Sequence, residues 1–95
     1  MLVLTLLAAV AIAAFLVMLT LAAVKKWFRQ NNGIRNKIQV NVVLKQKLAS
    51  GNYKTVAGVF DTADERIVTA NAWESEKLDE DLKKLDRVAV IRNLD

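Results

Sequence analysis

Residues 1–24 read MLVLTLLAAVAIAAFLVMLTLAAV, a stretch that contains no charged side chain, no proline and no glycine. Only Thr5 and Thr20 interrupt the apolar run between Leu2 and Val24. At a rise of about 1.5 Å per residue, a helix over this run would be roughly 35 Å long, enough to cross a hydrocarbon core of about 30 Å. A water-exposed helix would need a polar face, which this run lacks. The sequence therefore predicts a transmembrane helix over residues 1–24.

A cleaved signal peptide is the main alternative interpretation of the same run. Such a peptide needs a basic n-region, an apolar core of about 7–15 residues and a small-residue cleavage site before a polar region. Here only the α-amino group is basic before the run, and Ala22-Ala23 lies almost directly against Lys25-Lys26. A lipoprotein signal is excluded because the chain has no cysteine to acylate. These features favour an uncleaved anchor.

Positive charge predicts the orientation of this anchor. Basic residues flank its C-terminal side and none flanks its N-terminal side. Short basic flanks stay on the cytoplasmic side of a membrane. We therefore expect the N-terminus to be outside or lumenal and residues 25–95 to be cytoplasmic, at a bacterial inner membrane or an equivalent one.

Residues 25–36, KKWFRQNNGIRN, are predicted to form a basic interfacial segment and linker. Aromatic rings and basic side chains at the end of a span suit the headgroup region, and anionic lipid attracts Lys and Arg. Residues 1–60 contain eight Lys or Arg and no Asp or Glu, whereas all ten acidic residues follow. The predicted membrane-interface residues, near which anionic headgroups are expected, are Lys25, Lys26, Trp27, Phe28, Arg29, Arg35 and Lys37. Nucleic-acid binding by this stretch is disfavoured by its position beside the bilayer.

Residues 37–95 are predicted to form one small α+β domain. Alternating apolar and polar residues over 37–47 favour a strand, although a helical face is also approximated by Ile34, Ile38, Val42 and Leu48. Further strands are expected at 53–60, 66–73 and 88–91. With a helix at 75–86, the order is β-β-β-α-β, which predicts a mainly antiparallel sheet with one covering helix.

The helix at 75–86 is predicted from Leu78, Leu82 and Leu85, which form one apolar stripe, with Ser75 as its N-cap. About 58 residues is close to the lower limit for an independent core, so marginal stability or help from a partner chain is expected. The predicted core residues are Val40, Val42, Leu44, Val56, Phe60, Ile67, Trp73, Leu78, Leu82, Leu85, Val88 and Val90.

The composition argues against an enzyme. The chain has no His and no Cys, which removes the usual general base, the thiolate nucleophile and the commonest zinc ligands. Its three glycines are scattered, so no phosphate-binding loop is expected. The acidic residues Asp79, Glu80 and Asp81 would point in different directions on a helix and suit a solvated face better than a cation site. We therefore expect no catalytic residue, cofactor or metal.

Three classes of function remain open. Thr5, Ala9 and Ala13 would form a small-residue face for helix packing, and small accessory subunits of membrane complexes have this same outline of one helix plus a short domain. The sequence thus favours a membrane-anchored accessory, scaffold or assembly subunit with a protein partner or a homo-oligomeric contact. A phage or viral membrane or lysis protein, and a tethered regulatory module that senses anionic lipid, are the alternatives.

Overall fold

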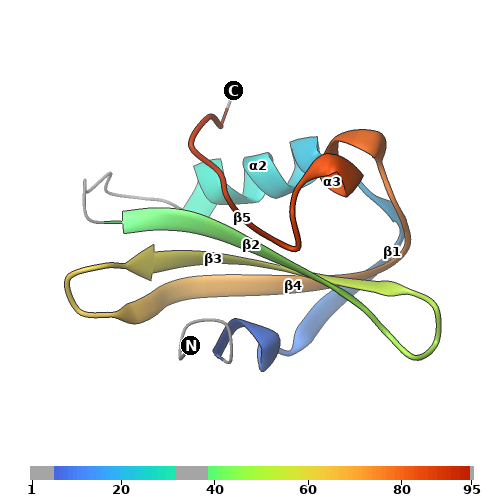
Figure 1. The fold of residues 1–95 in the computed structure, drawn as a ribbon, viewed down its shortest axis with the longest axis horizontal. Coiled ribbons are helices and arrows are strands. Elements are labelled where there is room, and N and C mark those ends of the chain that lie inside the picture. Colours follow the sequence, from blue (N-terminus) through green and yellow to red (C-terminus); the bar gives the residue numbers. More distant parts are fainter. Residues whose placement is uncertain (1–5, 32–38, 95) are drawn as a thin grey trace.

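A computed structural model describes residues 6–31 and 39–94 of the chain. Five strands form one mixed sheet in the order β1-β4-β3-β2-β5, and two short helices cover one of its faces (Figure 1). The elements are β1 (Ile12–Leu19), α2 (Leu21–Asn31), β2 (Gln39–Lys47), β3 (Tyr53–Asp61), β4 (Arg66–Leu78), α3 (Glu80–Lys84) and β5 (Val88–Val90). The predicted small α+β domain is confirmed, and its sheet is mixed: β1 pairs with β4 in parallel, whereas the β4–β3, β3–β2 and β2–β5 pairs are antiparallel.

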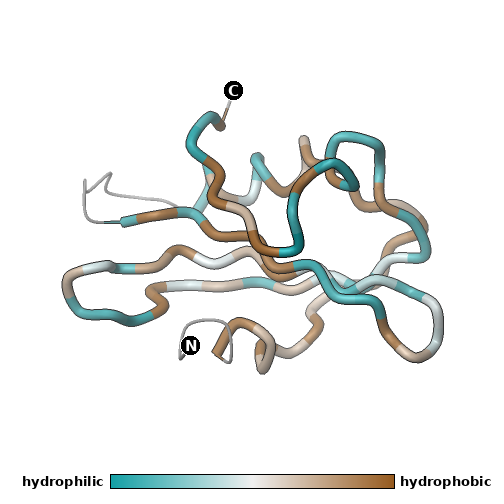
Figure 2. The backbone as a smooth tube through the Cα atoms, viewed as in Figure 1, coloured by the Kyte–Doolittle hydropathy of each residue, from teal (hydrophilic) through white to brown (hydrophobic). Residues whose placement is uncertain are grey.

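The central part of the sheet is an antiparallel meander of β2, β3 and β4. Its register sets Val43 opposite Ala57 and Val56 opposite Ala72. The short loops after β2 and β3 contain turn-forming residues, among them Gly51, whose φ of +95° suits glycine. Of the two predictions for residues 37–47, the strand is confirmed over Gln39–Lys47. Hydrophobic and hydrophilic residues alternate along much of these strands (Figure 2).

The predicted continuous helix over residues 1–24 is wrong for residues 6–24, the part of this run that the structure describes. Residues Ile12–Leu19 form strand β1, which pairs in parallel with β4 from Ala72 to Leu78. A uniformly apolar run has no periodicity that separates helix from strand, so the open edge of β4 decides the conformation. Among the described residues, no helix is long and apolar enough to cross a membrane.

The predicted helix at 75–86 is shorter in the structure. β4 continues as a strand to Leu78, because β1 pairs with its last residues and extends the sheet there. The helix α3 spans only Glu80–Lys84, and its N-cap is Asp79 rather than Ser75. The carboxylate of Asp79 accepts a hydrogen bond from the backbone N–H of Leu82 at 3.0 Å. The short helix keeps Leu82 buried against the sheet.

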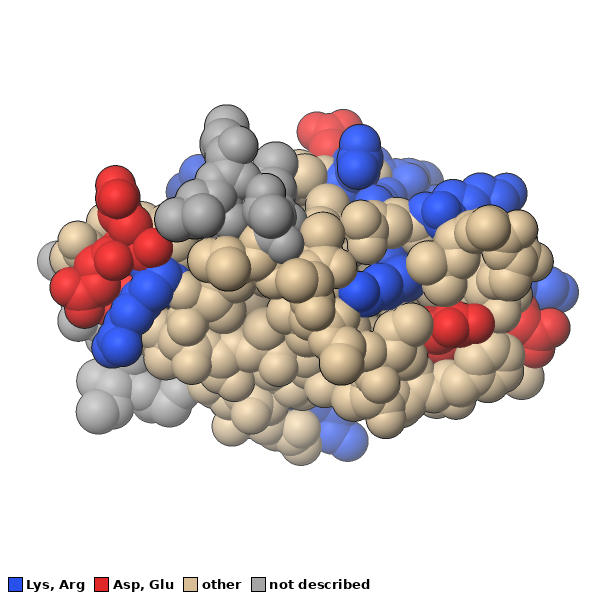
Figure 3. All heavy atoms as spheres, turned by 90° about the horizontal axis from the view of Figure 1, so that it is seen from below, with Lys and Arg blue, Asp and Glu red and all other residues tan. Residues whose placement is uncertain are grey.

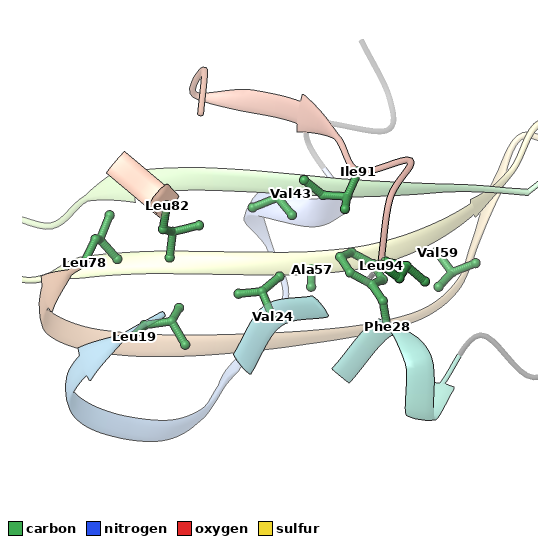
Figure 4. Packing of buried hydrophobic residues seen from close by; sticks show 10 residues of the cluster. All are labelled: Leu19, Val24, Phe28, Val43, Ala57, Val59, Leu78, Leu82, Ile91 and Leu94. Carbon is green, nitrogen blue, oxygen red and sulfur yellow. The ribbon is translucent and has the colours of Figure 1, made fainter. Parts of the chain in front are cut away.

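The main core lies between the sheet and the layer formed by α2, α3 and the C-terminal segment (Figure 4). Val24 and Phe28 of α2 are completely buried there, beside Leu82 of α3 and Val43 of β2. Leu19 and the C-terminal residues Ile91 and Leu94 complete the same cluster. The segment before residue 32 therefore supplies part of the core that the sequence assigned to residues 37–95 alone.

A second, smaller core lies on the opposite face of the sheet. Leu7 is 1% exposed and packs with Val42, Leu44 and Val56. A Cβ atom at Gly58 would lie 2.5 Å from Cδ2 of Leu7, so the glycine makes room for this side chain. Both faces of the meander are thus covered by residues from the N-terminal part of the chain.

The predicted core is confirmed in part. Five of its members are buried, namely Val42, Leu44, Val56, Leu78 and Leu82. Five others are half-buried, namely Val40, Phe60, Ile67, Trp73 and Leu85. Val88 and Val90 are 38% and 46% exposed, because β5 lies at an edge of the sheet and neither side chain is covered.

Candidate interaction surface

Strand β1 presents the largest run of exposed apolar side chains among the described residues. Phe15 is 56%, Val17 66% and Met18 48% exposed. Within residues 6–31 and 39–94, β1 is an edge strand that pairs with β4 alone, so its outer edge carries no strand from this part of the chain. An exposed, uncharged edge strand is a template for further pairing or for contact with an apolar phase.

The uncharged surface extends beyond β1. Leu6 and Ile12 are 42% and 41% exposed in the segment that leads into the strand. Figure 3 shows the molecule from below, with a broad uncharged area in the middle of this face and most of the charged side chains toward its ends. The segment is held on the sheet by Leu7 and by Lys54, whose Nζ donates a hydrogen bond to the carbonyl of Ala8 at 2.9 Å.

Capping hydrogen bonds at the junction between β1 and α2 define the start of the α2 helix. The hydroxyl of Thr20 accepts a hydrogen bond from the N–H of Ala23 at 3.1 Å, which is the geometry of an N-cap. The carboxylate of Asp79 accepts a second bond from the N–H of Leu21, also at 3.1 Å. A free N-terminal N–H group of a helix needs such a partner. α2 therefore begins as a helix of its own at Leu21.

α2 carries five of the predicted membrane-interface residues, and the structure separates their roles. Lys26 and Arg29 are exposed, Lys25 and Trp27 are half-buried, and Phe28 is completely buried. The Phe28 ring makes an edge contact with Trp27 at 5.3 Å between centroids, and Trp27 makes another with Trp73 at 6.1 Å. Phe28 therefore belongs to the core in this structure, because it follows Val24 by one helical turn on the buried face.

The remaining predicted residues do not gather into one site. Arg35, Lys37 and Thr5 lie outside the described residues. Ala9 lies in a turn, where its N–H donates to the carbonyl of Leu6, and Ala13 lies exposed on β1. Ala9 and Ala13 thus share no helical face here.

A basic pocket at the end of the sheet was not anticipated from the sequence. It has a volume of about 280 Å³ and lies between the β2–β3 hairpin and the α3 region. The side chains that line it include Lys45, Lys47, Lys83 and Arg87. Lys45 and Lys47 are two residues apart on one strand, and Lys83 and Arg87 are four apart. The spacing of Lys45 and Lys47 places both on one side of β2, whereas Lys83 lies in α3 and Arg87 lies beyond its end, so the sequence offered a signal for the first pair alone.

Lys45 has a structural role in this pocket. Its ammonium group donates hydrogen bonds to the carbonyls of Leu82, Lys83 and Leu85, which lie at the C-terminal end of α3. Burial lowers the pKa of Lys45, and the charge of Asp86 partly opposes this shift. Lys45 therefore fixes α3 on the sheet and contributes positive charge to the pocket.

Within residues 6–31 and 39–94, no group of three His, Cys, Asp or Glu side chains is arranged to hold a metal ion. The acidic residues Glu80 and Asp81 lie in the first turn of α3, where they suit the positive end of the helix dipole. No known protein family, curated protein or solved structure matches this chain.

Proposed function

We propose that the protein is a non-enzymatic, single-pass membrane-anchored accessory or scaffold subunit of a larger membrane complex. The observation that carries this proposal is β1, an uncharged edge strand that exposes Phe15, Val17 and Met18. Water-soluble monomers rarely leave contiguous apolar surface of this kind uncovered. A bilayer that receives the N-terminal segment removes that surface from water.

In this proposal the membrane span runs from Leu2 to Thr20, four residues shorter than the apolar run of the sequence. As a helix these 19 residues would be about 28 Å long, close to the thickness of a hydrocarbon core. A helix satisfies every backbone group of the segment internally, which a single strand in lipid cannot do. α2 stays with the domain because Val24 and Phe28 are buried in its core and Thr20 caps its first turn.

Insertion of the segment would also create a place for a protein partner. The backbone groups of β4 that pair with β1 between Ala72 and Leu78 would lose their neighbour. An open strand edge binds an added strand through main-chain hydrogen bonds. A strand of the partner subunit would replace β1 there, on the cytoplasmic side that the basic residues of α2 favour.

Lysine substitutions test the anchor. Ala13 and Phe15 are exposed on β1, so lysine at both positions is tolerated in the sheet, whereas each lysine near the centre of a span costs about 3 kcal/mol. We expect the Ala13→Lys/Phe15→Lys variant to be extracted from membranes by alkaline carbonate and the parent chain to be retained. Val68→Lys/Val90→Lys is the matched control, since both valines are exposed strand residues outside the segment. Equal extraction of all three chains would contradict the anchor.

Affinity purification in a mild detergent tests the accessory role. We expect the full chain to co-purify with one defined set of membrane proteins, and we expect lysine at Ala13 and Phe15 to abolish that association. Recovery of the free monomer alone would contradict an accessory role even if the anchor is retained in the membrane. Size-exclusion chromatography with light scattering then separates a hetero-complex from a homo-oligomer.

A further inference from the structure

The basic pocket has a lining that suits an anion. Four cationic side chains line it, from Lys45, Lys47, Lys83 and Arg87, and no carboxylate side chain is among its described lining residues. Tyr53 and Leu78 add an apolar wall. This concentration of positive charge stands out because residues 61–95, which supply two of the four cations, are net acidic.

The four cations are not equally free to bind a ligand. The Lys45 ammonium group already donates to three carbonyls, so it contributes charge rather than a hydrogen bond. Lys83 Nζ lies 3.8 Å from Glu80 in an exposed ion pair, which is weak in water. Lys47 lies over the Tyr53 ring, 5.4 Å from its centroid. Lys47 and Arg87, both exposed, are therefore the side chains best placed to turn toward a bound anion.

The position of the pocket relates it to the proposed anchor. Leu78 lines the pocket and is the register partner of Leu19, the last residue of β1. The pocket thus lies at the end of the sheet where the chain passes from β1 into α2, and the β2–β3 hairpin reaches the same end (Figure 1). If Leu2–Thr20 enters a bilayer, this end of the domain is the one next to the headgroups.

We infer that the pocket binds the phosphate group of an anionic lipid headgroup, an inference that rests on the proposed membrane anchor. Arg87 and Lys47 donate to the phosphate oxygens, Lys45 and Lys83 supply further positive charge, and the wall of Tyr53 and Leu78 contacts the glycerol backbone. Lys and Arg close to an anionic membrane surface favour this ligand over a zwitterionic one. The pocket then fixes the distance and rotation of the domain relative to the bilayer.

Native mass spectrometry of the full chain, released from uncharged maltoside micelles, tests the inference with phosphatidylglycerol and phosphatidylcholine as competing probes. We expect phosphatidylglycerol to be retained in preference to phosphatidylcholine. Each removed charge should weaken binding about fivefold, so Lys47→Gln/Arg87→Gln should bind phosphatidylglycerol roughly 25-fold more weakly. Arg66→Gln/Arg92→Gln is the control, because it removes two exposed cations outside the pocket. Circular dichroism verifies that both variants fold.

Several results would overturn the inference. If the two double variants lose phosphatidylglycerol binding equally, the binding depends on the overall charge of the protein and not on the pocket. If the protein retains phosphatidylglycerol and phosphatidylcholine equally, it has no preference for an anionic headgroup. Displacement of the lipid by inorganic phosphate at comparable concentration would make a soluble phosphate the ligand, and tighter binding of a polyglutamate peptide would make it an acidic protein segment. Carbonate extraction reports on the anchor separately: a chain that is extracted but keeps pocket-dependent phosphatidylglycerol binding contradicts the anchor alone.

Discussion

The carboxylate of Asp79 accepts a hydrogen bond from the backbone N–H of Leu21, 58 residues earlier in the chain, at 3.1 Å. The same oxygen accepts the N–H of Leu82 at 3.0 Å, so one side chain serves the first turns of both α2 and α3. The N–H of Asp79 in turn donates to the carbonyl of Leu19. The two bonds of Asp79 with Leu19 and Leu21 join the end of the apolar segment to the acidic half of the domain.

Replacement of Asp79 should destabilise the domain through both helix starts. We expect Asp79→Ala to lower the free energy of unfolding by about 1–2 kcal/mol, since it leaves two helix N–H groups without their acceptor. Asp79→Asn keeps an acceptor oxygen and should lose less. Urea unfolding followed by circular dichroism measures both changes. Ser75→Ala serves as a comparison, and a larger loss there would restore Ser75 as the helix cap.

Gly58→Ala tests whether the N-terminal segment packs on the sheet. The new Cβ would lie 2.5 Å from Leu7 Cδ2, and overpacking of a filled core costs about 1–3 kcal/mol. In a Leu7→Ala background the conflict disappears, so the same substitution should become nearly neutral. The free energies of unfolding of the parent chain, the two single variants and the double variant give the coupling free energy between Gly58 and Leu7. A neutral Gly58→Ala in the parent chain would show that Leu7 does not pack on Gly58, which is the arrangement that the proposed insertion of the segment into a bilayer requires.

Substitution of Phe28 by alanine should destabilise the domain much more than substitution of the adjacent Trp27. Phe28 is 0% exposed, and loss of such a ring costs about 3–5 kcal/mol, enough to unfold a small domain. Trp27 is half-buried, so Trp27→Ala should leave a folded domain with reduced stability. Thermal unfolding measures both variants. A folded Phe28→Ala protein of unchanged stability would place this ring outside the core, as the interfacial prediction from the sequence did.

Lys45→Met should loosen α3 without disturbing the strand that carries it. The variant loses the donors to three helix-end carbonyls, for an expected cost of about 1–3 kcal/mol. Lys47→Met, on the same strand and face but exposed, should change stability by less than about 0.5 kcal/mol. Hydrogen exchange of the α3 amides distinguishes local loosening from a global loss. Similar exchange in both variants would argue against the capping role of Lys45.

Thr55→Val should be neutral or slightly stabilising. The Thr55 hydroxyl is fully buried and has no hydrogen-bond partner among the described residues, and the same holds for the Ser75 hydroxyl on the neighbouring strand. Valine has nearly the same shape and removes the cost of an unpaired buried polar group, about 1 kcal/mol or more. Urea unfolding measures whether the free energy of unfolding rises or falls in the variant. A clear loss of stability would indicate that a bound water or a ligand uses this hydroxyl.

The meander is the part of the fold that local sequence signals predict. Residues 39–47, 53–61 and the first part of β4 have β-branched residues, alternation and turn-forming loops, so each strand is encoded where it lies. The extension of β4 to Leu78 has no such signal. It depends on pairing with β1, a segment more than 50 residues away in the chain.

The candidate pocket is likewise predictable from the sequence in part, and in part it depends on tertiary contacts. Lys45 and Lys47 are recognisable from the sequence as neighbours on one strand face, and Lys83 and Arg87 as near neighbours along the chain. Nothing local brings the two pairs together. That meeting requires α3 to fold back over β2, with the Lys45 ammonium group at its end.

By itself the sequence determined a small α+β domain with a meander at its centre, a composition without His or Cys, and an uncharged stretch of 24 residues. Only the tertiary structure decided that Phe28 and Val24 belong to the core, that α2 begins at Leu21 and that Ile12–Leu19 lies along β4. The physical reason is that periodicity encodes which face of an element is buried, whereas a uniformly apolar run suits any apolar neighbour. The free edge of β4 provides that neighbour in this structure.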